Sequence, residues 1–433
     1  MGPDPIVRRD PVDTGRTYLC IDLKSFYASV ECVDRGLDPF KDNLVVADPE
    51  RSRTTICLAA SPAIKALGVP SRCRVYEIPK HIHYTMAPPR MKRYMEVSAQ
   101  IYGIYLRRIS AQDIHVYSID ECFIDATPYL SLYHTDARTL ARQLMADVER
   151  ECGICATAGI GTNLFLAKVA LDITAKHVDD HIGYLDEREF RRKIWHHRPI
   201  TDIWGIGPGI ARRLLQYNVQ DLAGITQVDE RFLHKEFGVN AEYLIDHAWG
   251  YESCTMADIH AYRPHGHSTS NGQVLARDYS FSEARTVLSE MATSSALDLV
   301  EKHLVCGSVS LYVGYSWDDA GAPAAGAAHK LGELTNSRAK ILTRVLELYD
   351  EVSDPERAVR RLSVSLGGLC DEGFATRTLF DDVAAEEEEH SLSAATIAVQ
   401  KKFGKNALLR GVSFREEATQ RERNQQVGGH RAE

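Results

Sequence analysis

Long apolar runs are missing from this sequence. No stretch approaches the roughly 18 consecutive apolar residues of a membrane span, and the opening residues MGPDPIVRRDP lack the apolar core of a secretory signal. Cysteine is sparse as well, with ten in a chain of 433 residues, which excludes a disulfide scaffold. Together these absences predict a cytoplasmic protein with reduced thiols and no membrane contact. The hydrophobic content of 44% excludes wholesale disorder.

An excess of positive charge is missing too. The formal net charge is −9, which argues against a simple basic nucleic-acid binder. The negative charge is unevenly spread, because residues 371–389 hold eight acids and one arginine, a charge of −7 that leaves −2 for the rest of the chain. Any contact with nucleic acid would therefore depend on local patches.

Several common motifs are absent. The sequence contains no GxxxxGK[ST], and its glycine-rich segment GIGPG (205–209) does not match GxGxxG. The CxxC pair of Cys152 and Cys155 has neither a second pair nor a suitably spaced histidine pair. The sequence therefore argues against a P-loop NTPase, a dinucleotide-binding motif and a zinc site.

Strand-like and helix-like segments alternate over the first 184 residues. TYLCIDL (17–23) and CATAGIG (155–161) predict buried strands, HVYSIDECFIDAT (115–127) predicts a hairpin, and apolar residues four apart predict a helix over 136–150. This mixture predicts an α+β (mixed α/β) core. The rest of the chain predicts short helices over 185–256, a linker at 257–273, a second α/β unit at 274–370 and a tail at 371–433.

Three carboxylates are candidates for chemistry. Asp22 ends the first predicted strand, and Asp120 and Glu121 lie together in the predicted hairpin. If the hairpin lies beside that strand, the three acids converge, and such close like charges need a cation. Mg²⁺ takes carboxylates together with substrate phosphates, and two such ions support phosphoryl transfer. A solvated turn is the alternative interpretation of the Asp-Glu pair.

The segment ITDIWGIGPGIARRL (200–214) has a helix–hairpin–helix pattern. Gly205 and Gly207 would let the backbone approach a phosphate, and the following helix, which carries Arg212, would attract the anion. Such contacts would be insensitive to base sequence. A plain helix–turn–helix packing unit is the alternative.

The segment GIGTNLFLAKVALDITAK (159–176) predicts a helix with two lysines near one face. Either Lys168 or Lys176 could reach a triphosphate. A solvated helix face is the alternative.

Five segments, in this order, resemble the Y-family DNA polymerases, and most closely their UmuC-like branch, the catalytic type of bacterial DNA polymerase V. They are CIDLKSFYASVE (20–31), LAASPAIKALGV (58–69), YSIDECFID (117–125), GIGTNLFLAKVA (159–170) and DIWGIGPGIARRL (202–214). The resemblance covers roughly residues 17–380. It implies a right-hand polymerase with a palm at 17–25 and 95–184, fingers at 26–94, a helix–hairpin–helix thumb at 185–256 and a C-terminal little finger at 274–370.

The resemblance also implies roles for individual residues. Asp22, Asp120 and Glu121, joined by the backbone carbonyl of Leu23, match the ligands of two Mg²⁺ ions. Tyr27 matches the aromatic residue whose ring excludes a ribose 2′-hydroxyl, although it could also be an ordinary core aromatic. Residues implied to bind the incoming dNTP are Ser25, Phe26, Tyr27, Lys65 and Lys176. Residues implied to contact DNA are Gly205, Gly207, Arg212, Arg360 and Arg361.

The tail segment TRTLFDD (376–382) resembles a sliding-clamp-binding peptide. Its Leu379 and Phe380 would fill a hydrophobic pocket of the clamp, although Thr376 stands where a Gln is usual. A hydrophobic pair that tethers the tail to the fold is the alternative. Lys65 also departs from the Arg that many family members carry there.

The implied function is template-directed DNA synthesis of the translesion type, in DNA damage tolerance or an SOS-type response. The enzyme would add dNTPs to a primer 3′-OH by two-metal nucleotidyl transfer, in the cytoplasm and on the nucleoid when bound to DNA. Two rivals belong to other classes: a non-catalytic adaptor that binds DNA and recruits a clamp, and a metal-dependent nuclease. The adaptor would be expected to lack the carboxylates, and all three are present.

Overall fold

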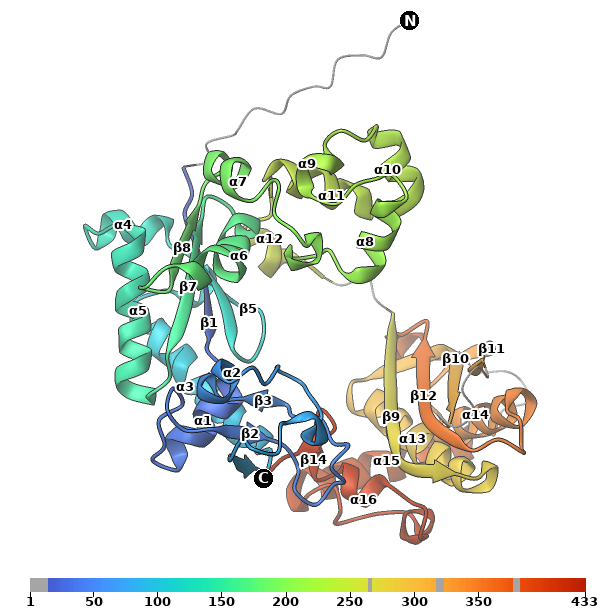
Figure 1. Ribbon diagram of the computed structural model, residues 1–433. Helices are drawn as coiled ribbons and strands as arrows, with labels where there is room; N and C mark the ends of the chain where they lie inside the picture. Colours follow the sequence, from blue (N-terminus) through green and yellow to red (C-terminus); the bar gives the residue numbers. More distant parts are fainter. Residues whose placement is uncertain (1–14, 264–266, 317–322, 377–381) are drawn as a thin grey trace, which may run out of the picture. The chain divides into compact units, whose positions relative to one another are not determined.

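The computed structural model describes residues 15–263, 267–316, 323–376 and 382–433. The chain divides into two compact units, one that ends at Arg263 and one that runs from Pro264 to Ala432 (Figure 1). The expected linker at 257–273 is shorter than predicted. Helix α12 (Met256–Ala261) and strand β9 (Ser268–Tyr279) occupy most of it, because a capping box at Thr255 starts the helix and β9 pairs with a long neighbour.

The first unit is built on a central five-stranded sheet of order β5-β6-β1-β7-β8. Its strands are β1 (Tyr18–Leu23), β5 (Ile114–Val116), β6 (Glu121–Asp125), β7 (Ala156–Gly161) and β8 (Ile182–Leu185). Strand β1 is antiparallel to both β6 and β7. The α+β class predicted from the sequence is confirmed, and the first predicted strand is the central one.

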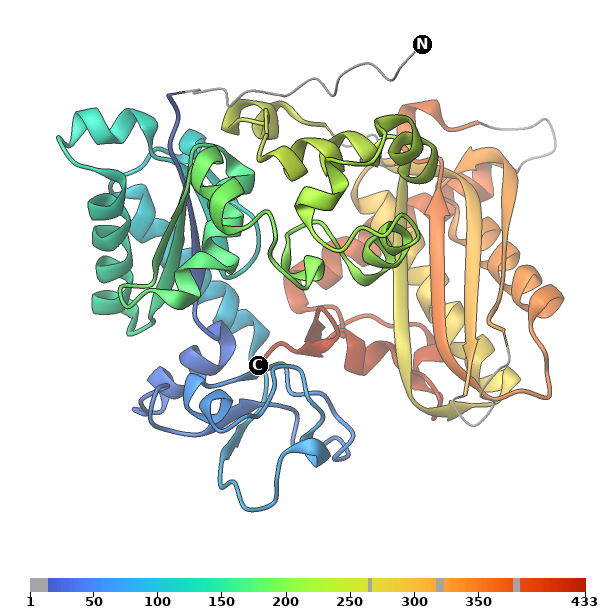
Figure 2. The same ribbon diagram turned by 45° about the horizontal axis from the view of Figure 1, so that its top comes forward.

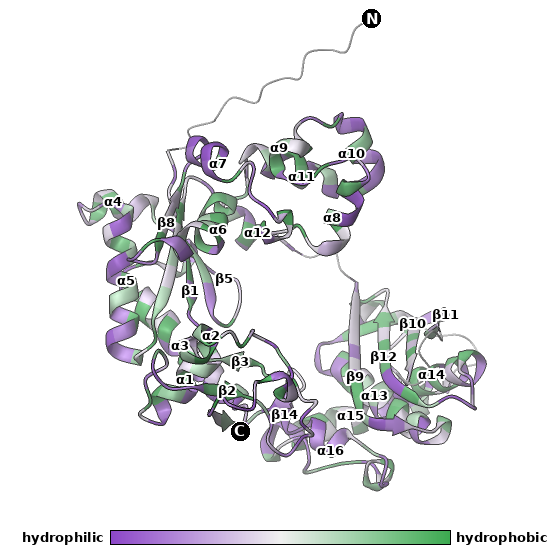
Figure 3. Cartoon of the chain, in the orientation of Figure 1, coloured by the Kyte–Doolittle hydropathy of each residue, from purple (hydrophilic) through white to green (hydrophobic). Residues whose placement is uncertain are grey.

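Helices cover both faces of this sheet. Helix α6 (Leu164–Asp172) packs on the face that carries Tyr18, Cys20 and Phe123. On the other side of the sheet lie α3 (Met91–Leu106) and α5 (Ala137–Cys152) (Figure 1). Because both faces are covered, every residue of β7 is buried. The central strands are accordingly hydrophobic, whereas helix α7 (Glu187–Lys193) is hydrophilic (Figure 3).

Two further groups of elements complete the first unit. Residues 26–94 form a small sheet of order β3-β2-β4, with β2 (Leu44–Val46), β3 (Ala59–Ala60), β4 (Thr85–Ala87), helices α1 (Phe26–Asp34) and α2 (Pro62–Ala66), and the 3₁₀ turn η1 (Val75–Glu77). Residues 187–261 are helical and comprise α7, η4 (Ile200–Asp202), α8 (Pro208–Leu215), α9 (Leu222–Ile225), α10 (Glu230–Phe237), α11 (Asn240–Trp249) and α12. The short connecting elements are η2 (Ala111–Asp113), α4 (Thr127–Leu132) and η3 (Thr174–His177).

A buried ion pair joins α1 to α3. The fully buried carboxylate of Glu31 accepts two hydrogen bonds from the guanidinium of Arg90, both at 2.9 Å, and one from the hydroxyl of Tyr94 at 2.7 Å. Arg35 pairs with the same carboxylate. Such a saturated network fixes the orientation of α1 relative to the central sheet.

The second unit is an antiparallel sheet of order β11-β10-β12-β9. Its strands are β9, β10 (Leu304–Tyr315), β11 (Ala325–Thr335) and β12 (Val359–Gly367), and the short β13 (Cys370–Asp371) pairs with β10. Helices α13 (Phe281–Glu301) and α14 (Arg338–Val352) bury one face, which carries Leu362, Val364 and Leu366 (Figure 2).

The segment after residue 381 also folds as part of this unit. It contains α15 (Val383–Phe403), η7 (Gly411–Phe414), α16 (Gln420–Arg423) and the small hairpin β14 (Gln426–Val427) and β15 (His430–Arg431), and it follows η6 (Glu372–Phe374). Among the described residues, no helix combines the length and the apolar character that crossing a membrane requires.

Two glycines of β7 set the distance between the sheet and α6. A Cβ atom on Gly161 would lie 2.2 Å from the backbone nitrogen of Ala167, and one on Gly159 would lie 2.1 Å from the backbone oxygen of the same residue. The helix backbone therefore lies directly on the strand, which only glycine permits.

We expect Gly161→Ala to destabilise the protein by ~3 kcal/mol, because the rigid backbone of α6 must move away from the sheet. The matched control is Gly103→Ala in α3, where an added Cβ meets nothing within 4 Å and should stabilise by about 0.5–1 kcal/mol. Urea unfolding of both variants measures the difference. Equal stabilities would show that α6 does not pack this closely.

Candidate active site

The three predicted carboxylates meet at the ends of two neighbouring strands. Asp22 on β1 lies directly opposite Glu121, the first residue of β6, in the antiparallel register. Asp120 immediately precedes β6, and its backbone oxygen accepts a hydrogen bond of 2.9 Å from the amide of Leu23. Residues almost 100 positions apart in the sequence are thereby brought to one edge of the sheet.

The charges of these acids act on one another. Burial raises the pKa of Asp22 to about 7, and the negative charges of Asp120 and Glu121 add to this effect. Repulsion between close carboxylates is the electrostatic condition that a divalent cation relieves. The donor set, which consists of hard carboxylate oxygens, therefore fits Mg²⁺.

The carboxylates are held by the protein's own hydrogen bonds. Glu121 Oε1 lies 2.8 Å from Lys168 Nζ and accepts a hydrogen bond of 3.0 Å from the thiol of Cys20. Asp120 Oδ1 accepts a hydrogen bond of 2.7 Å from the hydroxyl of Ser118. Across the described ranges, no three histidine, cysteine or acidic side chains stand in the arrangement of a metal site.

Helix α1 begins at Phe26, four residues after Asp22. Ser25, its first flanking residue, has left-handed backbone angles (φ 50°, ψ 43°), and its hydroxyl accepts a hydrogen bond of 2.7 Å from Lys65 Nζ. Burial lowers the pKa of Lys65, and the charge of Asp22 opposes this shift. The first amides of a helix have no acceptor within the helix and attract anions. The structure thus joins the predicted Ser25, Phe26, Tyr27 and Lys65 to the carboxylates.

Tyr27 is the second residue of α1, and its ring is close enough to Asp120 to feel its charge. It stacks on Tyr94 with ring centroids 4.3 Å apart, and Tyr94 is itself held by Glu31. Burial raises the pKa of Tyr27, and the charge of Asp120 contributes to the shift. The ring is therefore a rigid, half-buried wall next to the acids.

The two predicted lysines have different surroundings. Lys168 is buried, and its ammonium pairs with both Glu121 and Asp172. Lys176 is exposed on η3, and within the described part of the chain no ion pair connects it with the carboxylates. The helix α6 ends at Asp172, so the two lysines do not share one helix face as the spacing had suggested.

The glycine-rich turn of the helix–hairpin–helix pattern is open. Added Cβ atoms at Gly205 and Gly207 would meet nothing within 4 Å. Arg212 is exposed on α8, whereas the neighbouring Arg213 donates to the backbone oxygen of Glu236 and lies over Phe237. The first helix of the pattern is only the three-residue 3₁₀ turn η4, and Pro208 occupies the first position of the second helix, α8, where a proline is well tolerated.

The two predicted arginines of the second unit point differently. Arg361 is exposed on β12, opposite Gly314 of β10 and Val274 of β9. Arg360 Nη1 lies 3.4 Å from Asp278 Oδ1. Successive residues of a strand point to opposite faces, and a register shift between Val359 and Arg361 interrupts the pairing of β12 at this point.

The face of this sheet that the helices leave open is rich in small and hydroxyl side chains. Paired residues on it include Ser308 with Gly367, Ser310 with Ser365, Ser363 with Gly272, and Ser365 with Ser270. Arg361 and Lys330 add positive charge. Such a face lets a phosphate backbone approach closely.

The predicted clamp-binding residues Leu379 and Phe380 lie outside the described residues. Thr376, just before them, is fixed to β11, since its amide donates to the backbone oxygen of Leu334 at 3.0 Å and its hydroxyl accepts from the Leu334 amide at 2.7 Å.

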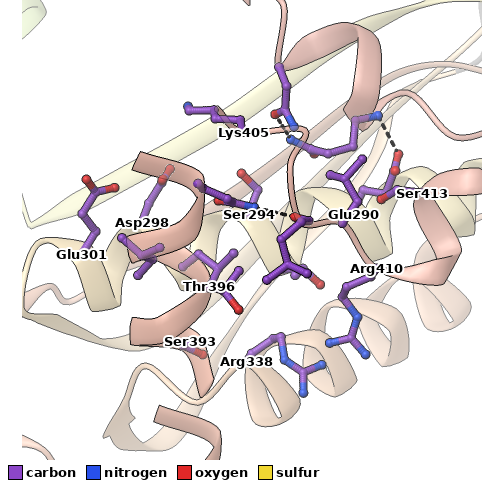
Figure 4. A pocket seen from close by; sticks show the side chains of 18 of the residues that line it. Glu290, Ser294, Asp298, Glu301, Arg338, Ser393, Thr396, Lys405, Arg410 and Ser413 are labelled. Carbon is purple, nitrogen blue, oxygen red and sulfur yellow. Dashed lines mark hydrogen bonds between the residues drawn. The ribbon is translucent and has the colours of Figure 1, made fainter. Parts of the chain in front are cut away.

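A cavity of about 820 Å³ lies in the second unit, between α13, α15 and the chain from Lys405 to Asn424 (Figure 4). Glu290 in its wall is buried and accepts hydrogen bonds from the amides of Thr419 and Gln420. Arg338 pairs with Glu389 at another side. None of the residues predicted from the sequence lines this cavity.

Two features of the site were missed from the sequence. The ion pair between Lys168 and Glu121 was not predicted. The ion pair between Lys168 and Asp172 could have been, because the two residues stand four positions apart in a predicted helix. The indole of Trp204 donates to the hydroxyl of Tyr117 at 3.1 Å, which connects the glycine-rich turn to the strand that leads to Asp120. No pattern in the sequence indicates a contact between residues so far apart.

Comparison with known proteins agrees with this geometry. Residues 21–172 match the model of the impB/mucB/samB family, and residues 267–379 match that of the family's C-terminal domain. The chain belongs to this family. The resemblance to Y-family translesion polymerases is thereby confirmed.

Individual relatives cover nearly the whole chain. The putative UV-damage repair protein UvrX of Bacillus subtilis (strain 168) is 31% identical over 96% of this chain and 98% of its own length. DNA polymerase IV 2 of the same organism is 29% identical over 95% of this chain and 97% of its own length. A Y-family DNA polymerase chimera, Dbh-Dpo4(243-245)-Dbh, superimposes with a TM-score of 0.62 at 20% identity, over 82% of this chain and 99% of the chimera, which supports the right-hand polymerase fold.

We expect Asp22→Asn to stabilise the metal-free protein at pH 8. The folded pKa of Asp22 is about 7 against a usual 3.8, so ionisation in the folded state carries a cost that grows as pH rises from about 4 to 7 and is complete above 7. Asp120, Glu121, Asp172, Lys168 and Lys65 are the charged groups that face it. The gain should be on the order of 2 kcal/mol at pH 8 and vanish at pH 4.

Unfolding in urea with EDTA at both pH values measures this effect. Asp179→Asn, on an exposed surface position, is the control and should change stability at neither pH. A gain that is equal at pH 4 and pH 8 would contradict the assignment of the cost to ionisation.

Proposed function

We propose that this chain is a template-directed DNA polymerase of the translesion type, which adds dNTPs to a primer 3′-OH in DNA damage tolerance. The observation that carries the proposal is the convergence of Asp22, Asp120 and Glu121 beside the N-terminus of α1. Family membership and the polymerase fold support it. The adaptor alternative is not favoured, because all three acids are present and gathered at one site.

In this proposal each part of the site has one task. Asp22, Asp120, Glu121 and the carbonyl of Leu23 hold two Mg²⁺ ions. When bound, these ions supply positive charge to the attacking hydroxyl and to the leaving pyrophosphate. The amides of Ser25, Phe26 and Tyr27, with Lys65, bind and orient the triphosphate. Lys176 is assigned to the same triphosphate from the resemblance alone.

DNA contacts are assigned to surfaces with the matching chemistry. Gly205 and Gly207 form an open turn before α8, and Arg212 and Arg361 are exposed cations; we assign all four to the phosphate backbone. Arg360, which pairs with Asp278, is assigned to the phosphate backbone from the resemblance alone. We keep the palm, fingers, thumb and little-finger boundaries as 17–25 with 95–184, 26–94, 185–256 and 274–370.

Two further assignments remain predictions. Contact with a sliding clamp through Leu379 and Phe380 rests on the sequence resemblance. The cytoplasmic, nucleoid-associated location rests on the family and on the composition.

Primer extension tests the carboxylates. Asp120→Asn and Glu121→Gln keep the size of each side chain and remove its charge, so nucleotide addition should fall ~100-fold or more because the ions lose a ligand. Asp179→Asn should extend as the wild type does. Binding of primer–template, measured by fluorescence anisotropy, should change less than threefold in all variants.

The same assay separates the rivals, since labelled primer lengthens with a polymerase, shortens with a nuclease and stays unchanged with an adaptor. Extension by both carboxylate variants at the wild-type rate would overturn the assignment.

Sugar selectivity tests Tyr27. Tyr27→Ala should raise the efficiency of ribonucleotide addition relative to dNTP addition by ~100-fold, because the wall against the 2′-hydroxyl is removed. Tyr27→Phe keeps the ring stacked on Tyr94 and should retain the wild-type selectivity. Steady-state kcat/KM for a matched dNTP and rNTP pair gives the ratio, and an unchanged ratio in Tyr27→Ala would remove Tyr27 from this role.

A further inference from the structure

Lys168 is a buried cation in contact with a proposed metal ligand. It lies in the middle of α6, on the helix side that packs against the sheet face of Cys20 and Glu121. Its side chain is only 10% exposed. Its ammonium lies 2.8 Å from Glu121 Oε1 and 3.0 Å from Asp172 Oδ1. A lysine held in this way cannot serve the triphosphate unless it leaves both acids.

The protein contacts only one of the two carboxylate oxygens of Glu121 within the described residues. Oε1 takes both the ammonium of Lys168 and the thiol of Cys20, at 2.8 and 3.0 Å. Within the described residues, Oε2 has neither a hydrogen bond nor an ion pair. The side chain of Glu121 is 9% exposed, so its orientation is fixed by these two partners. One oxygen is held by the protein and the other is available to a ligand.

We propose that Lys168 is a positioning residue for the metal site: it holds Oε1 of Glu121 so that Oε2 faces the ions, and its charge lowers the affinity of the site for them. The inference rests on the proposed function of Glu121 as a metal ligand. Partners of ligating carboxylates set their orientation. A positive charge beside a divalent cation weakens its binding, and the negative charge of Asp172 offsets this in part.

Lys168 thus has two effects of opposite sign. Without it, the site is more negative and should bind a divalent ion more tightly. Without it, Glu121 is also free to rotate, so the ions should be poorly placed for catalysis. A purely structural lysine would lower both affinity and rate when removed, whereas this role separates them.

Binding of Mn²⁺ alone, followed by the electron paramagnetic resonance signal of the free ion, tests the charge effect. Lys168→Met should bind Mn²⁺ ~10-fold more tightly than the wild type, while its kcat in primer extension falls ~10-fold or more. Lys168→Arg keeps the charge, so its Mn²⁺ affinity should stay within about threefold of the wild type. Unchanged or weaker Mn²⁺ binding by folded Lys168→Met would overturn the proposal.

A second variant decides the question if Lys168→Met does not fold, as judged by circular dichroism. Asp172→Asn removes the acid that offsets the charge of Lys168 and is one-third exposed, so it should fold and should bind Mn²⁺ ~3-fold or more weakly. Unchanged Mn²⁺ affinity in this variant would then overturn the proposal. Mn²⁺ binding requires no DNA synthesis, so these results stand apart from the outcome of the primer-extension assay.

Discussion

The register between β1 and β6 is the constraint on which the site depends. It places Asp22 opposite Glu121 and Cys20 opposite Phe123, so both acids share the face covered by α6. A slip of one residue would move Asp22 to the face of α3 and α5. Small residues on β7 fix the distance at which α6 lies, and this distance lets Lys168 reach Glu121. Backbone packing therefore determines the electrostatics of the site.

The same arrangement explains why the acids are costly to the folded protein. Three carboxylates converge at a partly buried edge, and the folded state raises the pKa of Asp22 rather than lowering it. Lys168 compensates one acid, and Lys65 stands over Ser25 on the other side. The remaining negative charge is unbalanced by the protein itself. Such a site lowers the stability of the folded protein and favours the binding of cations, which is typical of functional sites.

Much of the fold and of the site could be predicted from local sequence. The apolar run TYLCIDL, the hairpin with Asp120 and Glu121 and the helix after Asn163 are all observed, because each signal lies within a few residues. Contacts between distant segments could not be predicted. The sequence suggested that Lys168 could bind a triphosphate. Only the folded sheet shows that Lys168 pairs with Glu121 instead. Arg360 and Arg361 are adjacent in sequence, yet Arg360 pairs with Asp278 while Arg361 is exposed.

The acidic segment at 371–389 shows how contacts between distant residues alter what can be concluded from net charge. By sequence, residues 371–389 carry a charge of −7 and would be expected to repel a polyanion as a solvated tail. In the structure, Glu386 and Glu389 lie on α15 and pair with Lys340 and Arg338 of α14, so part of this charge is neutralised where α15 docks. The open sheet face of the same unit instead presents serines, glycines, Arg361 and Lys330. A net charge of −9 is thus compatible with DNA binding, because Glu386 and Glu389 pair with α14, which covers the other face of the sheet from the proposed DNA-binding face.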